Sequence, residues 1–140
     1  MTRIFADACY WIALLRRNDQ LHAAAKAAQS QLKNAHVVTT DEVLSEVLNF
    51  LGSGGDQMRS IAAQMVEELR KDSRVTVVEQ SRATFDGGLG RYKKHADKRW
   101  SVVDCVSFEL MTRDGITQAL TNDHHFEQAG FTPLLRTRTT

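Results

Sequence analysis

Four acidic residues in four separate segments of the 140-residue chain could together perform phosphodiester hydrolysis. They are Asp7, Glu46, Asp104 and Asp123. Two carboxylates suffice for general acid–base catalysis, whereas four in one place would repel one another at neutral pH unless cations lay among them. Ligand sets made only of oxygen favour Mg²⁺ or Mn²⁺, which activate water and neutralise charge on phosphate. If the four segments converge, the acids indicate a metal-dependent nuclease or phosphatase.

The last acid stands in the stretch LTNDHHFEQAG, residues 120–130, where two histidines suggest a different metal site. Imidazole suits Zn²⁺ and other transition metals, but the remaining acids suit harder ions. Adjacent residues of a helix also point about 100° apart, so His124 and His125 are not expected to ligate one ion together easily. We therefore interpret Asp123 as the functional residue and Phe126 as the anchor of a short helix. The histidines are expected to order the turn, with a phosphate contact as the alternative.

Strand-like and helix-like segments alternate along the chain and must position these acids. The expected strands cover residues 3–7, 35–40, 74–79, 116–121 and, at an edge where Pro133 is tolerated, 131–135. The expected helices cover residues 11–15, 21–32, 41–51, 58–69, 82–92, 100–112 and a short segment ending at Gly130. This alternation predicts an α/β fold with a parallel sheet between helices. In such sheets ligands bind beyond the carboxyl ends of the strands.

Each acid has a functional and a simpler interpretation. Asp7 closes the first expected strand and Asp123 lies just beyond the fourth, where each could equally cap the next helix. Glu46 lies about 130° from the centre of the apolar stripe of its helix, at the border of the core, whereas Glu42 points away and is expected in solvent. Asp104 falls in the first turn of a largely apolar helix, where it is either paired with a partner or simply favourable to the helix dipole.

Composition limits the class of protein. The length fits a single domain over residues 1–140, and 42% hydrophobic with 25% charged residues is typical of a soluble globular protein. Apolar runs are too short to span a membrane and the first residues lack the pattern of a signal peptide, so a cytoplasmic location is expected. Cys9 and Cys105 have no zinc-type spacing and are expected to be small buried thiols.

The net charge of +1 says little, but cationic residues gather in the segment RYKKHADKR. They are Arg91, Lys93, Lys94, Lys98 and Arg99. Such a run is either a solvated face or a set of phosphate contacts.

The chain resembles PIN-domain proteins, specifically VapC-type toxin ribonucleases of type II toxin–antitoxin systems. The segments that carry the resemblance are IFADACYWIALL, TTDEVLSEVLNFL, DKRWSVVDCVSFELM and ALTNDHHFEQAGF. It implies a three-layer α/β/α sandwich with a central, mostly parallel sheet of four to five strands. It also implies endonucleolytic hydrolysis of RNA with Mg²⁺ or Mn²⁺.

The family's acidic positions map onto the same four acids. Asp7 and Asp104 would be the principal metal ligands, and Glu46 and Asp123 would complete the site directly or through waters. Ser101 and Asn122 would form hydrogen bonds around the ligands. The five cationic residues would contact RNA phosphates.

The resemblance further implies a partner antitoxin and a homodimer. The helix at Met58–Leu69 and the helix that reaches Phe50 are candidate contact surfaces, unless their apolar faces are ordinary core. Two departures from the family pattern concern substrate contacts rather than reaction class. Ala8 stands where a hydroxyl residue often follows the first aspartate, and Arg99 where a further acid often occurs.

The sequence fits two other functions less well than it fits a nuclease. A catalytically inactive RNA-binding or assembly module with this fold should have lost at least one of the four acids, and all are present. A small-molecule phosphatase usually carries Asp-x-Asp after its first strand, whereas Asp7 is followed by Ala8 and Cys9. The sequence therefore favours a metal-dependent endoribonuclease.

Overall fold

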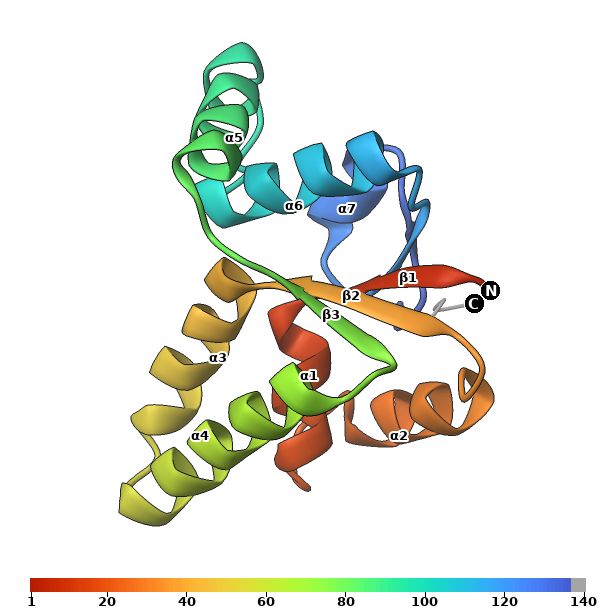
Figure 1. The fold of residues 1–140 in the computed structure, drawn as a ribbon, viewed down its shortest axis with the longest axis vertical. Helices are drawn as coiled ribbons and strands as arrows, with labels where there is room; N and C mark the ends of the chain where they lie inside the picture. Colours follow the sequence, from red (N-terminus) through yellow and green to blue (C-terminus); the bar gives the residue numbers. More distant parts are fainter. Residues whose placement is uncertain (137–140) are drawn as a thin grey trace.

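A computed structural model of the protein describes residues 1–136 (Figure 1). Along the chain the elements are β1 (Arg3–Ala6), α1 (Ala8–Leu15), α2 (His22–Gln31), β2 (His36–Thr40), α3 (Asp41–Gly52), α4 (Asp56–Lys71), β3 (Val75–Val78), α5 (Arg82–Lys94), α6 (Val102–Asp114), β4 (Gln118–Leu120), α7 (His124–Gln128) and β5 (Thr132–Pro133). The alternation of strands and helices expected from the sequence is confirmed. Within the described residues, no helix is both long and apolar enough to cross a membrane.

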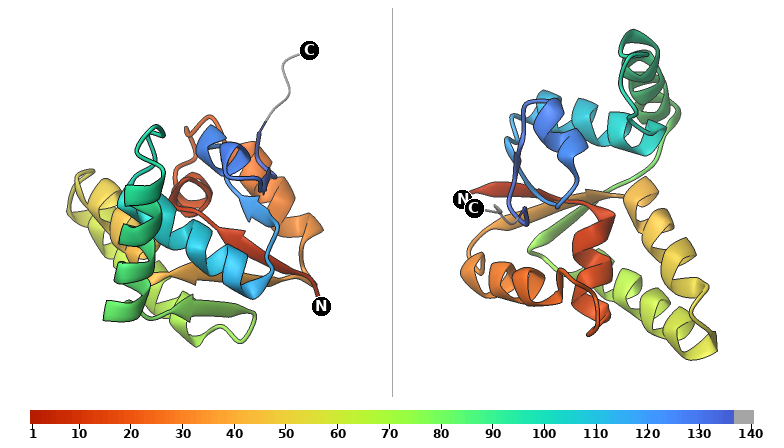
Figure 2. Two further views of the ribbon diagram at one scale, coloured as in Figure 1. Left: turned by 90° about the horizontal axis from the view of Figure 1, so that it is seen from above. Right: turned by 180° about the vertical axis from the view of Figure 1, so that it is seen from behind.

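The five strands form one parallel sheet in the order β3-β2-β1-β4-β5. Helices α1 to α4 lie on one face and α5 to α7 on the other, as Figures 1 and 2 show. The predicted α/β/α sandwich is therefore confirmed. Helices α1 and α2, which follow β1, lie on one face of the sheet, and α5 and α6, which precede β4, lie on the other. Neighbouring strands whose helices lie on opposite faces leave a crevice at their carboxyl ends. Ala6 is paired with Leu120 in this register.

Aromatic rings in tilted and edge-to-face contact fix two helices to the central strand on the α5–α7 face. The Phe126 ring of α7 lies 4.9 Å from Phe108 of α6 and 6.2 Å from Phe5 of β1, centroid to centroid. All three side chains are fully buried. Trp100, just before α6, packs edge-on against Phe108 at 5.0 Å and donates a hydrogen bond to Gln128. This packing sets where the N-termini of α6 and α7 lie relative to the end of β1.

The α5–α6 pair depends on a close approach that only glycine permits. Helix α5 packs on α6 and extends beyond the sheet (Figure 1). It runs two residues past the expected end at Tyr92, to Lys94. A Cβ atom added at Gly88 would lie 2.4 Å from Cγ2 of Val106, whereas one added at Gly90 would meet nothing within 4 Å.

Gly88→Ala is expected to lower the free energy of unfolding by about 1–3 kcal/mol, because the added methyl group forces α5 away from α6. Gly90→Ala, two positions along the same helix, should instead raise it by about 0.5–1 kcal/mol through helix propensity. Urea denaturation of both variants measures the difference. Equal stability of the two variants would show that the helices are not in close contact at Gly88.

Candidate metal centre

The four acids predicted from the sequence line a single cleft of about 620 Å³ at the carboxyl ends of β1 and β4. Asp7 follows β1, Glu46 lies on α3, Asp104 on α6 and Asp123 just before α7. Ser101 and Asn122 line the same cleft. Four separate elements thus bring their acidic side chains to one place, as the sheet topology requires.

Asp7 is the most deeply buried of the four, with 8% of its surface exposed. It occupies the N-cap position of α1, but its side chain accepts no capping hydrogen bond, so capping does not account for it. Burial raises the pKa of Asp7 to about 6, and the charges of Asp104 and Asp123 add to the rise. Hydrogen bonds from the Ala8 backbone and the Thr121 hydroxyl act in the opposite direction.

Thr121 joins two of the acids and was missed by sequence reasoning. Its hydroxyl donates to Oδ2 of Asp7 at 2.9 Å and accepts the backbone N–H of Asp123 at 3.0 Å. The side chain is fully buried. Ala8, the residue after Asp7, has no hydroxyl group. In this chain the hydroxyl group beside Asp7 therefore comes from Thr121. The available signal was a hydroxyl residue at the last position of an expected strand.

Asp104 is held at the first turn of α6 by a reciprocal pair of hydrogen bonds. Its backbone N–H donates to the Ser101 hydroxyl at 3.0 Å, and its Oδ2 accepts the Ser101 N–H at 3.1 Å. This capping box satisfies the helix end and includes the hydroxyl of Ser101 predicted to lie beside the site. Loss of water raises the pKa of Asp104, and the Asp123 charge raises it further, while hydrogen bonds from Ser101 and His125 lower it.

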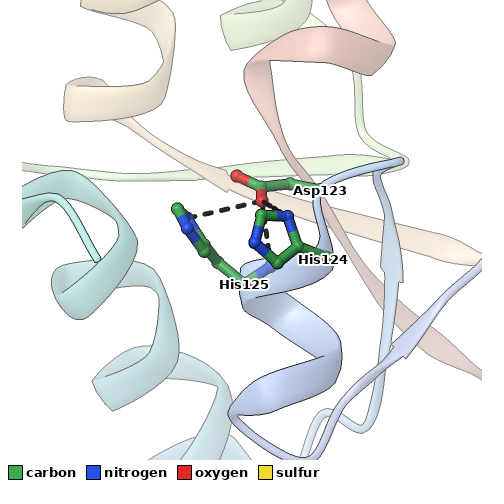
Figure 3. A group of neighbouring side chains, drawn as sticks. All are labelled: Asp123, His124 and His125. Atoms are coloured by element: carbon green, nitrogen blue, oxygen red, sulfur yellow. Dashed lines mark hydrogen bonds and ion pairs between the residues drawn. The ribbon is translucent and has the colours of Figure 1, made fainter. Parts of the chain in front are cut away.

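The histidine pair departs from expectation. The imidazole centroids of His124 and His125 lie only 4.4 Å apart, and both rings face Asp123 (Figure 3). The rings come together although adjacent helix positions point about 100° apart, because both Nδ1 atoms lie near Asp123 Oδ1, at 3.6 and 3.4 Å. Asp123 caps α7 by accepting the His125 N–H at 2.9 Å. His125 Nδ1 also lies 3.1 Å from Oδ2 of Asp104.

His125 thereby lies between two of the predicted ligands, a role that sequence reasoning did not assign to it. Its side chain is 19% exposed and lines the cleft, whereas that of His124 is 60% exposed. Ligand atoms of Asp123, His124 and His125 lie within 4.8 Å of one another. These three residues alone are a mixed nitrogen and oxygen set, which suits transition metals. The cleft as a whole is dominated by carboxylates.

The two glutamates of α3, Glu46 and Glu42, line different clefts. Glu46 lines the cleft, and partial loss of water at its carboxyl group, followed by the charges of Asp7, Asp104 and Asp123, raises its pKa to about 7. Glu42 was expected in solvent but is partly buried in a different cleft, between α3, α5 and α6. The α5–α6 pair covers that end of α3, which the periodicity of α3 alone cannot show.

The donor set fits a hard divalent cation. Within residues 1–136, the residues lining the cleft include four carboxylates but only Arg99 and His125 as basic side chains. Three of these carboxyl groups have a raised pKa, because each loses part of its contact with water and lies beside other acids. A cation bound among them would relieve this repulsion, and oxygen ligands favour Mg²⁺ or Mn²⁺.

The predicted phosphate-contacting residues do not lie together. Arg99 lines the acidic cleft, whereas Arg91, Lys93 and Lys94 line a separate cleft at the end of α5. Arg91 donates to Glu109 at 2.7 Å, and Lys98 lies 3.6 Å from Asp97. Only Arg99 of the five is therefore adjacent to the acids.

Fold, sheet order and acidic cleft together define a PIN domain, and a model of that family matches residues 4–132. The chain belongs to the PIN-domain family, as the sequence predicted. Over 129 residues it is 30% identical to the 23S rRNA-specific endonuclease VapC20 of Mycobacterium tuberculosis, with 91% of this chain and 95% of that protein aligned; the match is the same in two strains.

A crystal structure of Mycobacterium tuberculosis VapC20, described as a sarcin-ricin loop cleaving toxin, has the same fold. Its TM-score is 0.82 at 29% sequence identity, and the superposition covers 92% of this chain and 96% of that one. The predicted similarity to VapC-type toxins is therefore confirmed.

The raised pKa of Asp7 predicts that stability falls with rising pH when divalent metal is absent. The folded carboxyl group keeps its proton up to about pH 6, while the unfolded one releases it near pH 4, so the native state holds more protons between these values. In EDTA, the decline in unfolding free energy from pH 4 to 7 should be about 2–3 kcal/mol smaller for Asp7→Asn.

Denaturant titrations at several pH values test this. Asp97→Asn is the control, since its carboxylate is 73% exposed and should leave the pH dependence as in the unmodified protein. Parallel pH profiles for Asp7→Asn and the unmodified protein would contradict the burial of an acid at this position.

Thr121→Val is expected to destabilise the protein by about 1–3 kcal/mol, since it removes both hydrogen bonds and leaves the Asp123 N–H without its acceptor. It should also weaken Mn²⁺ binding by roughly 10- to 100-fold, as loss of a group that orients metal ligands does. Thr121→Ser keeps the hydroxyl and should restore metal affinity. Calorimetric titration with Mn²⁺ measures both variants, and equal affinity for them would rule out the orienting role.

Proposed function

We propose that this protein is a metal-dependent endoribonuclease of the VapC toxin type. The observation that carries the proposal is the convergence of four carboxylates from four elements in one cleft. The similarity to VapC20 over 91% of the chain supports RNA as the substrate class. Because the relative is a 23S rRNA-specific endonuclease, ribosomal RNA is the first substrate to test.

In the proposed site, Asp7 and Asp104 would hold Mg²⁺ or Mn²⁺, and Glu46 and Asp123 would complete the set directly or through waters. When bound, the cation lowers the pKa of water and neutralises charge that develops on the scissile phosphate. The chain's own contribution is orientation. Thr121 fixes Asp7, Ser101 fixes Asp104, and His125 lies between Asp104 and Asp123. The exposed Asn122 borders the cleft and is placed to contact substrate or ligating waters.

The same relationship supports a protein antitoxin as a partner, and a homodimer is part of the proposal. Most apolar residues of α4, including Met58, Met65 and Leu69, pack partly buried against the core. Ile61 is 38% exposed and Phe50, on α3, is 50% exposed. The α3–α4 side thus combines ordinary core packing with a limited exposed apolar surface for a partner.

Purified protein should cleave 23S rRNA or a fragment of it in Mg²⁺ or Mn²⁺ and lose this activity in EDTA. Asp104→Asn and Glu46→Gln should each lower the cleavage rate more than about 100-fold, since even residues that only orient metal ligands contribute 10- to 100-fold. Gel analysis of end-labelled RNA provides the measurement.

Glu42→Gln is the matched control. It removes a carboxylate from the helix that carries Glu46, but this carboxylate lies outside the acidic cleft. It should cleave at nearly the unmodified rate. RNA cleavage that persists in EDTA, or that survives Asp104→Asn, would falsify the metal-dependent mechanism.

A further inference from the structure

A second cleft borders the acidic one and shares a wall with it. It has a volume of about 520 Å³ and lies between the end of α1 and the α3–α4 turn. Phe50 lines both clefts, and it follows Glu46 by four residues, one turn along α3. A chain running past the carboxylates on this side therefore meets Phe50 next.

Phe50 is an aromatic residue that folding leaves half exposed, at 50%. The guanidinium of Arg16 lies over its ring, 5.2 Å from the centroid. Arg16 also forms an ion pair with Asp19 at 3.8 Å, and its side chain is 36% exposed. Arg17 and Asn18, both exposed, line the same cleft. An aromatic ring, cationic side chains and an amide are thus grouped beside the acids.

We propose that Phe50 and Arg16 form a subsite for an unpaired nucleotide of the RNA, next to the bond that is cleaved. The base stacks on Phe50, and the guanidinium of Arg16 contacts a phosphate. This inference rests on the proposed ribonuclease function and specifies how the substrate is held.

Two physical arguments favour RNA in this cleft. Four carboxylates repel a polyanion, so cations must hold the strand at the borders of the acidic cleft. Arg99 lines that cleft directly, and Arg16 supplies a cation beyond Phe50. Unpaired bases are also bound largely by stacking on aromatic rings and guanidinium planes, which the Phe50–Arg16 pair presents together.

The chain contains a matched pair elsewhere. On α5, the guanidinium of Arg82 lies 5.8 Å from the ring centroid of Phe85, which is 44% exposed. Neither residue lines the acidic cleft or its neighbour. Phe85→Leu therefore removes a similarly exposed aromatic ring beneath an arginine without touching the proposed subsite.

The test is RNA binding by fluorescence anisotropy, with every variant made in an Asp104→Asn background that prevents cleavage. Phe50→Leu should weaken binding of a single-stranded RNA substrate roughly 5- to 150-fold, the effect expected for loss of one base–aromatic stack. Phe50→Trp should retain affinity, and Phe85→Leu should bind as the background protein does. Thermal melts of the variants verify that each is folded.

Salt dependence separates the two contacts. Arg16→Gln should reduce the slope of log affinity against log salt by about 0.7, the value for one phosphate contact on a single strand. Phe50→Leu should leave that slope unchanged. This pattern would support the subsite.

The inference is overturned if Phe50→Leu binds RNA as tightly as the background protein, or if Phe85→Leu weakens binding equally. A variant that loses affinity for a protein partner but not for RNA would likewise assign the cleft to that partner. Failure of the ribonuclease proposal itself is a separate outcome, recognised by the absence of metal-dependent cleavage in the protein with Asp104 intact.

Discussion

Mutual repulsion among carboxylates is the constraint on which this structure depends. Asp7, Glu46 and Asp104 all carry a raised pKa, because each is partly removed from water beside acidic neighbours. Side chains that repel one another do not stay together unless the backbone around them is fixed by other interactions. Favourable interactions elsewhere in the molecule must therefore keep these acidic side chains close together against their electrostatic repulsion.

Those interactions are packing and hydrogen bonds just outside the cleft. The rings of Phe5, Phe108 and Phe126 tie β1, α6 and α7 together, and these elements adjoin or carry three of the four acids. At the cleft itself, Thr121 and His125 each contact two acidic residues. A buried hydroxyl and an imidazole thus take up hydrogen bonds that the carboxylates would otherwise make with water. Buried aromatic packing and these two polar side chains therefore hold the acids in place together.

The sequence predicted the elements well, because hydrophobic periodicity and helix caps are local. The alternation of strands and helices and the choice of the four acids both came from such patterns. It did not predict that α5 and α6 cover Glu42, or that the two histidines face one acid. Those facts depend on how distant segments pack. Thr121 was missed for the same reason: its hydroxyl has a partner only once β4 lies beside β1.

The pairing of β1 with β4 also bears on how the protein is made. Asp7 and Thr121 are separated by 114 positions in the chain, so their contact closes a very long loop and forms only when nearly all the other elements exist. During synthesis from the N-terminus, Asp7 and Glu46 leave the ribosome long before Asp104 and Asp123. A nascent chain accordingly carries only part of the acidic cleft until β4 joins the sheet. If the protein cleaves RNA as proposed, the ribosome that synthesises it meets the complete acidic cleft only at the end of translation.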